Sequence, residues 1–389
     1  MLANCGNILV GERSQHRVTQ IGTQMNKRQD ATAELNPRIV GSPAVLFAGA
    51  GASATLGFKT ATGFLEVVRT ICRPDIEFSR IFEDWRQKAS IEQQDIENVL
   101  DYLESLKASD HAAERLDIAL RRAIVQHYSD IEADKALKHY GWLSMFLKAY
   151  PEALHPLPIF TTNYDWVFER GIGSYKSYIR LLDGFRPTRF GTFWDNATFA
   201  RFKGSRLSWD IPYFKLHGST SWYLQPNGRI IKTTHAELDP GQLKTMLIYP
   251  TLTNKKPLEI EPYATCFRYF RGCLSLGCHI CVVIGFSFRD AEICKVFSDA
   301  FKVNKSLRLI VVDPYPDEAR ILMALGTDHD HVKFISEPFR HYGLDDNKTL
   351  ADELLARMPE RSIMKQDTRY GTPQERFAAI AVMKGFPGI

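Results

Sequence analysis

The chain has 389 residues, of which 44% are hydrophobic and 24% are charged, the proportions of an ordinary globular protein. Its net charge of +4 comes without a Lys/Arg block or a basic-aromatic stripe, so nothing indicates nucleic-acid binding. The best apolar run, 280–286, is too short for a transmembrane helix, and the first residues lack the layout of a secretory signal. Seven cysteines in apolar contexts favour reduced thiols and a cytoplasmic location over a disulfide framework.

The first structural signal is a buried strand that ends in a turn of very small residues. Residues 1–37 are polar and predict a flexible N-terminal arm. The apolar run 44–48 then leads into Gly49-Ala50-Gly51-Ala52-Ser53. Small residues allow backbone N–H groups to approach a phosphate or a sugar, and Ser53 is suited to cap a following helix. This turn predicts a nucleotide site, although tight packing between a strand and a helix explains it as well.

A helical region follows. From about residue 74 to 150 the apolar residues repeat with a helical period, as in Ile96, Val99, Leu100 and Leu103. We interpret this region as a helical module inserted after the first βα unit. His127 falls on an apolar face of the same region and is interpreted as a core or rim histidine rather than a ligand.

The second half of the chain predicts more strands of the same sheet. Segment 157–165 is an expected strand with a polar end. An aromatic-rich region with hairpin-like turns, 178–256, follows it, and within this region segment 212–219 is another expected strand with a polar end. After a helix over 262–277, strands over 280–285, 307–313 and 332–335 alternate with helices. These strands are rich in Val and Ile without alternation, which predicts a parallel sheet covered by helices on both faces. We therefore expect one domain over 38–345 and a C-terminal region, 346–389, with a helix over 350–357.

Five expected strand ends carry polar or very small residues. In a parallel sheet these ends meet at one edge, where ligands bind. Each has a simpler explanation, because Asn163, Asp165, Ser287 and Asp290 are suited to cap helices and Asp313 to a turn. Their combination favours a shared site. The candidate residues are Gly49, Ala50, Gly51, Ser53, Thr162, Asn163, Asp165, His217, Gly218, Gly285, Ser287, Asp290 and Asp313.

Together these segments resemble the sirtuin-type NAD-binding fold. The matching pieces are the turn 49–53, the segment 161–165, Leu216-His217-Gly218, and Gly285 with Ser287, and they occur in the family's order. Two features of sirtuin deacylases are missing. Only Cys278 and Cys281 have the Cys-x-x-Cys spacing of the zinc ribbon, so we expect buried thiols and no metal. The segment 59–64 replaces the deacylases' Pro-Asp-Phe-Arg motif. The expected fold is α/β, a Rossmann-like parallel sheet of the sirtuin type with an inserted helical module and no zinc ribbon.

The resemblance also implies roles for the candidate residues. Asn163 would orient the nicotinamide ribose and the attacking water, and His217 would act as the general base. Asp165 would help shape the nicotinamide end. Gly49, Ala50, Gly51 and Ser53 would face pyrophosphate and ribose, while Ser287 and Asp313 would hold the adenosine half. Thr162, Gly218, Gly285 and Asp290 are expected to bind NAD as well.

The function implied by the resemblance is cleavage of NAD to nicotinamide and ADP-ribose, as in bacterial sirtuin-like effectors that deplete NAD in antiphage defence. Such an enzyme needs control, so a homo-oligomer and a regulatory partner such as a HerA-like hexameric ATPase are expected by analogy. Two alternatives stay open: an NAD-dependent protein deacylase or ADP-ribosyltransferase, and a non-catalytic module that senses NAD or ADP-ribose.

Overall fold

The computed structural model describes residues 35–54, 56–129, 131–132, 135–136, 156–173, 179–203, 209–233, 244–249 and 258–336. The predicted N-terminal arm up to residue 34 and the predicted helix over 350–357 lie outside these ranges. Among the helices of the described ranges, none is both long enough and apolar enough to cross a membrane.

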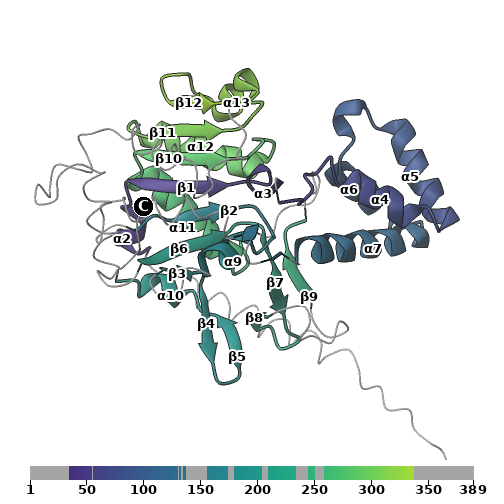
Figure 1. The fold of residues 1–389 in the computed structure, drawn as a ribbon, viewed down its shortest axis with the longest axis horizontal. Helices are drawn as coiled ribbons and strands as arrows, with labels where there is room; N and C mark the ends of the chain where they lie inside the picture. Colours follow the sequence, from purple (N-terminus) through teal and green to yellow (C-terminus); the bar gives the residue numbers. More distant parts are fainter. Residues whose placement is uncertain are drawn as a thin grey trace, which may run out of the picture.

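A seven-stranded sheet forms the centre of the molecule, with strand order β12-β11-β10-β1-β2-β6-β3 (Figure 1). Every neighbouring pair in it is parallel, as the non-alternating apolar strands predict. The strands are β1 (Ala44–Ala48), β2 (Ile159–Thr161), β3 (Ile179–Leu182), β6 (Trp209–Lys215), β10 (Ile280–Ile284), β11 (Arg308–Val312) and β12 (Val332–Ile335).

Both faces of this sheet are buried. On β1, Val45 and Phe47 belong to one hydrophobic core, while Ala44 and Leu46 belong to a second core across the sheet. The first core packs against α2 (Pro37–Val40), α11 (Tyr263–Leu276), α12 (Ala291–Val303) and α13 (Glu318–Leu325). The second includes residues of α9 (Val167–Gly173). Because side chains alternate across a strand, burial on both faces requires the continuous apolar runs seen in the sequence.

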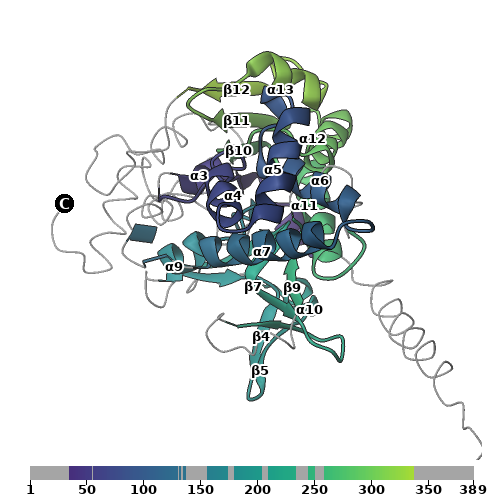
Figure 2. The same cartoon turned by 90° about the vertical axis from the view of Figure 1, so that its right-hand side faces the viewer.

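Four helices between β1 and β2 form a separate block, which we call the helical block. They are α4 (Leu65–Cys72), α5 (Ile76–Lys88), α6 (Ile96–Leu106) and α7 (His111–Tyr128), and they follow the short α3 (Gly51–Ala54) and precede β2. Asp75, Asp95 and Asp110 cap α5, α6 and α7. The helical residues predicted to share a face, including Val99 and Leu100, are buried in a core of the block's own. The block stands beside the carboxyl ends of the parallel strands (Figures 1 and 2).

The aromatic-rich middle of the chain forms a five-stranded sheet with order β4-β5-β8-β7-β9 and antiparallel pairing. Its elements are β4 (Phe185–Thr188), β5 (Gly191–Trp194), β7 (Gly218–Leu224), β8 (Ile230–Lys232) and β9 (Lys244–Leu247), with α10 (Ala197–Ala200) after β5. The predicted hairpin turn at Asn227-Gly228 joins β7 to β8, with Gly228 at φ 81°. β7 begins directly after His217, so this sheet extends from the site end of β6.

Candidate functional site

A cavity of about 840 Å³ lies between the carboxyl ends of the parallel strands and the helical block. Its size falls within the range of small-molecule sites. The polar strand ends therefore meet at one place, as their order along the chain predicts. Eleven of the thirteen candidate residues line the cavity: Ala50, Gly51, Ser53, Thr162, Asn163, Asp165, His217, Gly285, Ser287, Asp290 and Asp313.

The glycine-rich turn brings two backbones into contact. A Cβ at Gly49 would lie 2.6 Å from the Gly285 carbonyl oxygen, and one at Gly51 would lie 2.8 Å from the Gly285 Cα. Gly285 itself has φ +60°, a conformation that favours glycine. Gly49 is therefore required for packing and does not line the cavity.

The backbone N–H groups of this turn are mostly used within the protein, contrary to the expected role as phosphate donors. Gly49 N–H donates to the Ile284 carbonyl and Gly51 N–H to the Gly285 carbonyl, at 2.9 and 2.8 Å. Ala52 and Ser53 donate back into the turn itself. The turn thus supplies a close wall and the Ser53 side chain rather than a set of N–H donors.

Gly218 is likewise explained by packing. It has φ +83°, and a Cβ there would lie 2.1 Å from the Met246 carbonyl oxygen on β9. The glycine after His217 therefore permits β7 to pair with β9, and it does not line the cavity. Sequence alone does not separate such a backbone contact from a ligand contact, which is why Gly49 and Gly218 were both predicted as site residues.

Asn163 presents an unsatisfied acceptor to the cavity. Its backbone N–H donates to Thr161 Oγ1 at 3.0 Å, and its Nδ2 donates to Ser53 Oγ at 3.1 Å. These two bonds fix the orientation of the amide. The residue is 7% exposed, and its Oδ1 is buried with no hydrogen-bond partner among the described residues. Because an unpaired buried carbonyl oxygen costs free energy, the site is suited to a ligand hydroxyl or a water that donates to Oδ1.

Ser53 connects Asn163 to a buried carboxylate. Its hydroxyl accepts from Asn163 and also hydrogen-bonds Asp165, so Ser53 does not cap a helix as predicted but lies within α3. Burial raises the pKa of the Asp165 carboxyl, and the nearby Lys215 ammonium opposes that rise. Asp165 also accepts from the Val167 N–H at 3.0 Å, so it lines the cavity and caps the next helix at once.

His217 and Asp290 meet across the cavity floor. Nε2 of His217, in the turn after β6, lies 3.0 Å from Oδ2 of Asp290 at the start of α12. Their side chains are 12% and 11% exposed. The predicted base therefore has a carboxylate beside it, an arrangement that orients an imidazole and stabilises its protonated form. From the sequence, Asp290 was expected to bind NAD, and nothing in the sequence paired it with His217.

The loop between β10 and α12 is strained at Phe288, which has φ 54° although it is bulky and 2% exposed. Such a conformation is costly and persists only where the surrounding packing enforces it. Phe288 packs against Phe286 and Phe297. The strain accompanies the placement of Ser287 on one side and of Asp290 on the other, and both line the cavity.

At the far end of the cavity, Asp313 follows β11. Its Oδ1 accepts from the Tyr315 N–H at 2.9 Å, which confirms that Asp313 is a turn residue, and it also lines the cavity. The Tyr315 side chain is 89% exposed at the cavity rim.

The wall opposite the strands was not predicted from the sequence. It consists of the loop 58–62 together with residues of the helical block and a nearby loop: Phe64, Ile96, Glu97, Ile124, Tyr128 and Tyr249. The sequence gives one indication of this wall, the segment 59–64 that stands where sirtuin deacylases carry the Pro-Asp-Phe-Arg motif. The helical residues of this wall could not be predicted, because residues that face a cavity and residues that face a core recur along a helix with the same spacing.

His127 holds this loop in place and is not a cavity residue. Its Nε2 accepts from the Lys59 N–H at 3.0 Å, and Tyr128 Oη donates to the Lys59 carbonyl at 2.5 Å. Burial lowers the pKa of His127, and the Lys59 charge adds to the effect. A neutral histidine is the form that accepts this bond, so the interpretation of His127 as a structural histidine is confirmed.

Residues 158–329 match the family model of the SIR2-like domain. The match covers the strands that carry Asn163, His217 and Ser287, whereas the turn 49–53 and the helical block precede it. No curated relative matches the sequence. The SIR2-like domain indicates an NAD-related function and supports the expected sirtuin-like sheet.

The six cysteines in the described ranges are all buried free thiols: Cys72, Cys266, Cys273, Cys278, Cys281 and Cys294. Cys278 and Cys281, the one pair with zinc-ribbon spacing, flank and enter the central strand β10, where they pack in the core. Within the described residues no group of three or more metal-ligating side chains is present.

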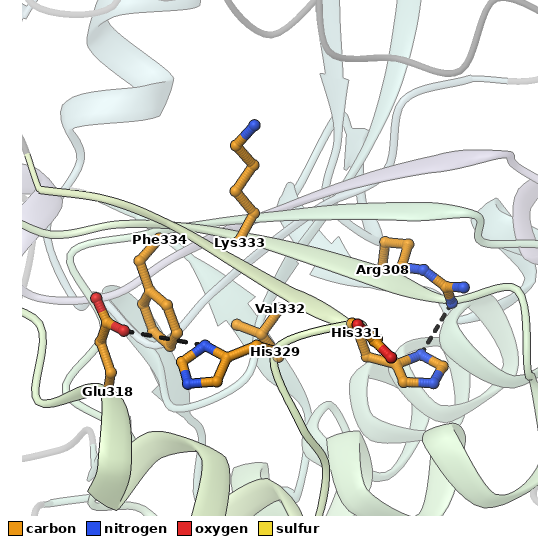
Figure 3. Close-up of a pocket in the computed structure, with 8 residues that line it drawn as sticks. Arg308, Glu318, His329, His331, Val332, Lys333 and Phe334 are labelled. Atoms are coloured by element: carbon orange, nitrogen blue, oxygen red, sulfur yellow. Dashed lines mark hydrogen bonds and ion pairs between the residues drawn. The ribbon is translucent and has the colours of Figure 1, made fainter.

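A second hollow, of about 500 Å³, lies beside β11, α13 and β12 (Figure 3). None of the candidate residues lines it. Two pairs of its polar side chains contact each other, since Arg308 donates to His331 Nδ1 at 2.9 Å and His329 lies 4.0 Å from Glu318. The cavity at the strand ends is therefore the candidate site.

Proposed function

We propose that this protein hydrolyses NAD at the nicotinamide–ribose bond, which gives nicotinamide and ADP-ribose. The observation that carries the proposal is the oriented Asn163 amide in the same cavity as His217. Its buried Oδ1 has no hydrogen-bond partner in the part of the chain that the structure describes. A site that only binds a nucleotide has no need of a base beside the ribose. The SIR2-like match supports NAD as the ligand.

Cleavage of the nicotinamide–ribose bond needs little acid catalysis from the protein, because the nicotinamide group is already cationic before it leaves. Cleavage passes through an oxocarbenium-like state that an enclosed polar site stabilises. Asn163 would accept a hydrogen bond from the ribose or from the attacking water, and His217 would take a proton from one of these hydroxyl groups. Ser287 and Asp313 would hold the adenosine half, with the Asp313 carboxylate toward ribose hydroxyls.

The test is to follow nicotinamide release from NAD by the purified full-length chain, with Asn163→Ala and His217→Ala as variants. Each variant is expected to lower kcat by about 10²-fold or more. Turnover that survives either substitution would show that the assigned mechanism is wrong. Release that requires an acetylated peptide would favour a deacylase instead, and NAD binding that never leads to cleavage would favour a sensing module.

As a biological role, we propose that NAD depletion makes the protein a toxic effector in antiphage defence. The support is analogy with sirtuin-like effectors of the same motif spelling. Regulation would then come from self-assembly or from a partner, for which a HerA-like hexameric ATPase is the first candidate. The assay above is therefore run with and without such a partner.

A further inference from the structure

We propose that Asp290 is a positioning residue for His217, rather than a direct ligand of the nucleotide. The inference rests on the proposed NAD hydrolysis for its kinetic consequences, but its geometric basis is independent of it. Asp290 holds the imidazole in place and favours the protonated state that His217 reaches once it has taken a proton.

Hydrogen bonds to the backbone of α12 fix the Asp290 carboxylate independently of its contact with His217. Its Oδ1 accepts from the backbone N–H groups of Glu292 and Ile293, at 3.0 and 3.2 Å, and so caps α12. The other carboxylate oxygen, Oδ2, lies 3.0 Å from His217 Nε2. A cap that is held by two N–H groups keeps the carboxylate in one rotamer, so little side-chain entropy is lost in orienting the imidazole.

Both side chains are largely removed from solvent, which strengthens the interaction. A carboxylate next to an imidazole stabilises the imidazolium and raises the histidine pKa. Other titratable groups that line the same cavity are Lys59, Glu97, Tyr128, Tyr164, Asp165, Tyr249, Arg289, Glu292, Asp313 and Tyr315. Of these groups and Asp290, the Asp290 carboxylate lies in ion-pair contact with His217, at 3.0 Å.

The substitution Asp290→Asn separates the two functions of this side chain. Asparagine caps a helix about as well as aspartate, so α12 keeps its cap, while the negative charge beside His217 is lost. Asp75→Asn is the matched control, because Asp75 caps α5 through the same pair of bonds and faces Arg115 at 3.6 Å, but lies outside the cavity. A second variant, Asp290→Ser, retains a capping hydroxyl and removes the carboxylate entirely.

The first measurement needs no activity. Histidine ring signals are followed by NMR against pH in the full-length protein, with the His217 signal assigned by its loss in His217→Gln. The pKa of His217 is expected to be lower in Asp290→Asn than in the wild type, because the neighbouring negative charge is lost, and to stay unchanged in Asp75→Asn. Equal His217 titration in wild type and Asp290→Asn would overturn the proposal, whether or not the protein cleaves NAD.

The second measurement is kinetic. If His217 is the base, Asp290→Asn lowers kcat by about 10²-fold while KM changes less than about threefold. The acidic limb of kcat/KM moves to lower pH, because the histidine loses its proton more easily. A raised KM with kcat and pH profile unchanged would identify Asp290 as a nucleotide ligand and overturn the proposal. An Asp290→Asn protein with wild-type kinetics would reduce Asp290 to a helix cap.

Discussion

At the level of single residues, the glycines of the site act through the distance between two backbones. Gly49 and Gly51 on one turn and Gly285 on the other allow the ends of β1 and β10 to touch. The small residues predict backbone N–H groups that donate to a ligand at the turn 49–53. In the structure, the N–H groups of this turn mostly donate to carbonyls of the protein. A run of small residues indicates close approach, and only the fold shows what is approached.

Gly285→Ala is expected to destabilise the protein by about 3 kcal/mol or more. The new Cβ would lie 2.2 Å from the Ala52 nitrogen, and the residue would keep a left-handed φ of +60°. The free energy of unfolding from urea titration measures the effect. Gly57→Ala is the control, because Gly57 has φ +93° but open space around its Cβ position, and it is expected to cost only about 1 kcal/mol. An equal loss in the free energy of unfolding at both positions would show that the backbone contact at Gly285 does not contribute to stability.

At the level of elements, the helices and parallel strands followed from local pattern, and their packing did not. The period of Val99, Leu100 and Leu103 defined α6, and the unbroken apolar run 280–284 defined β10. Neither pattern contains the position of the helical block relative to the sheet. That position is set by contacts between segments far apart in the chain, such as the ion pair between Asp95 of the block and Arg289 after β10.

The helical block has a hydrophobic core separate from the two cores of the sheet, so we expect it to unfold first. Cys72 reports on the block, where burial raises its pKa to about 12, and Cys281 reports on β10, where burial raises the pKa of the thiol strongly. With single-cysteine variants, labelling by Ellman's reagent should reach Cys72 at a lower urea concentration than Cys281. Simultaneous labelling of both would mean that block and sheet unfold as one unit.

At the level of the whole molecule, the side of the cavity built by strand ends could be predicted, and the opposite wall could not. Parallel strands bring their carboxyl ends to one edge by topology, so Asn163, His217 and Ser287 were placed together from their order alone. The loop 59–62 and Glu97 reach the same cavity only because the helical block docks on that edge. No local sequence pattern predicts that the helical block packs against the ends of the strands. The site is therefore a property of two packed units.

The ion pair between Arg289 and Asp95 joins these two units. Nη1 of Arg289, in the loop before α12, lies 3.6 Å from Oδ2 of Asp95. Asp95 caps α6, and its side chain is 5% exposed. Arg289→Met is expected to weaken binding of ADP-ribose about fivefold to tenfold, because the wall of the cavity loses a contact to the strand edge. Calorimetric titration of the full-length protein with ADP-ribose measures this.

Two further variants decide how Arg289 acts. Arg80→Met removes an exposed ion pair to Asp110 within the helical block, away from the cavity, and should leave the affinity unchanged. Asp95→Asn keeps the cap of α6 and breaks the contact from the other side. If Arg289 acts by joining the two units, Asp95→Asn weakens binding as much as Arg289→Met, and the double variant is no worse than either. Additive losses would mean instead that Arg289 contacts the nucleotide itself, independently of the helical block.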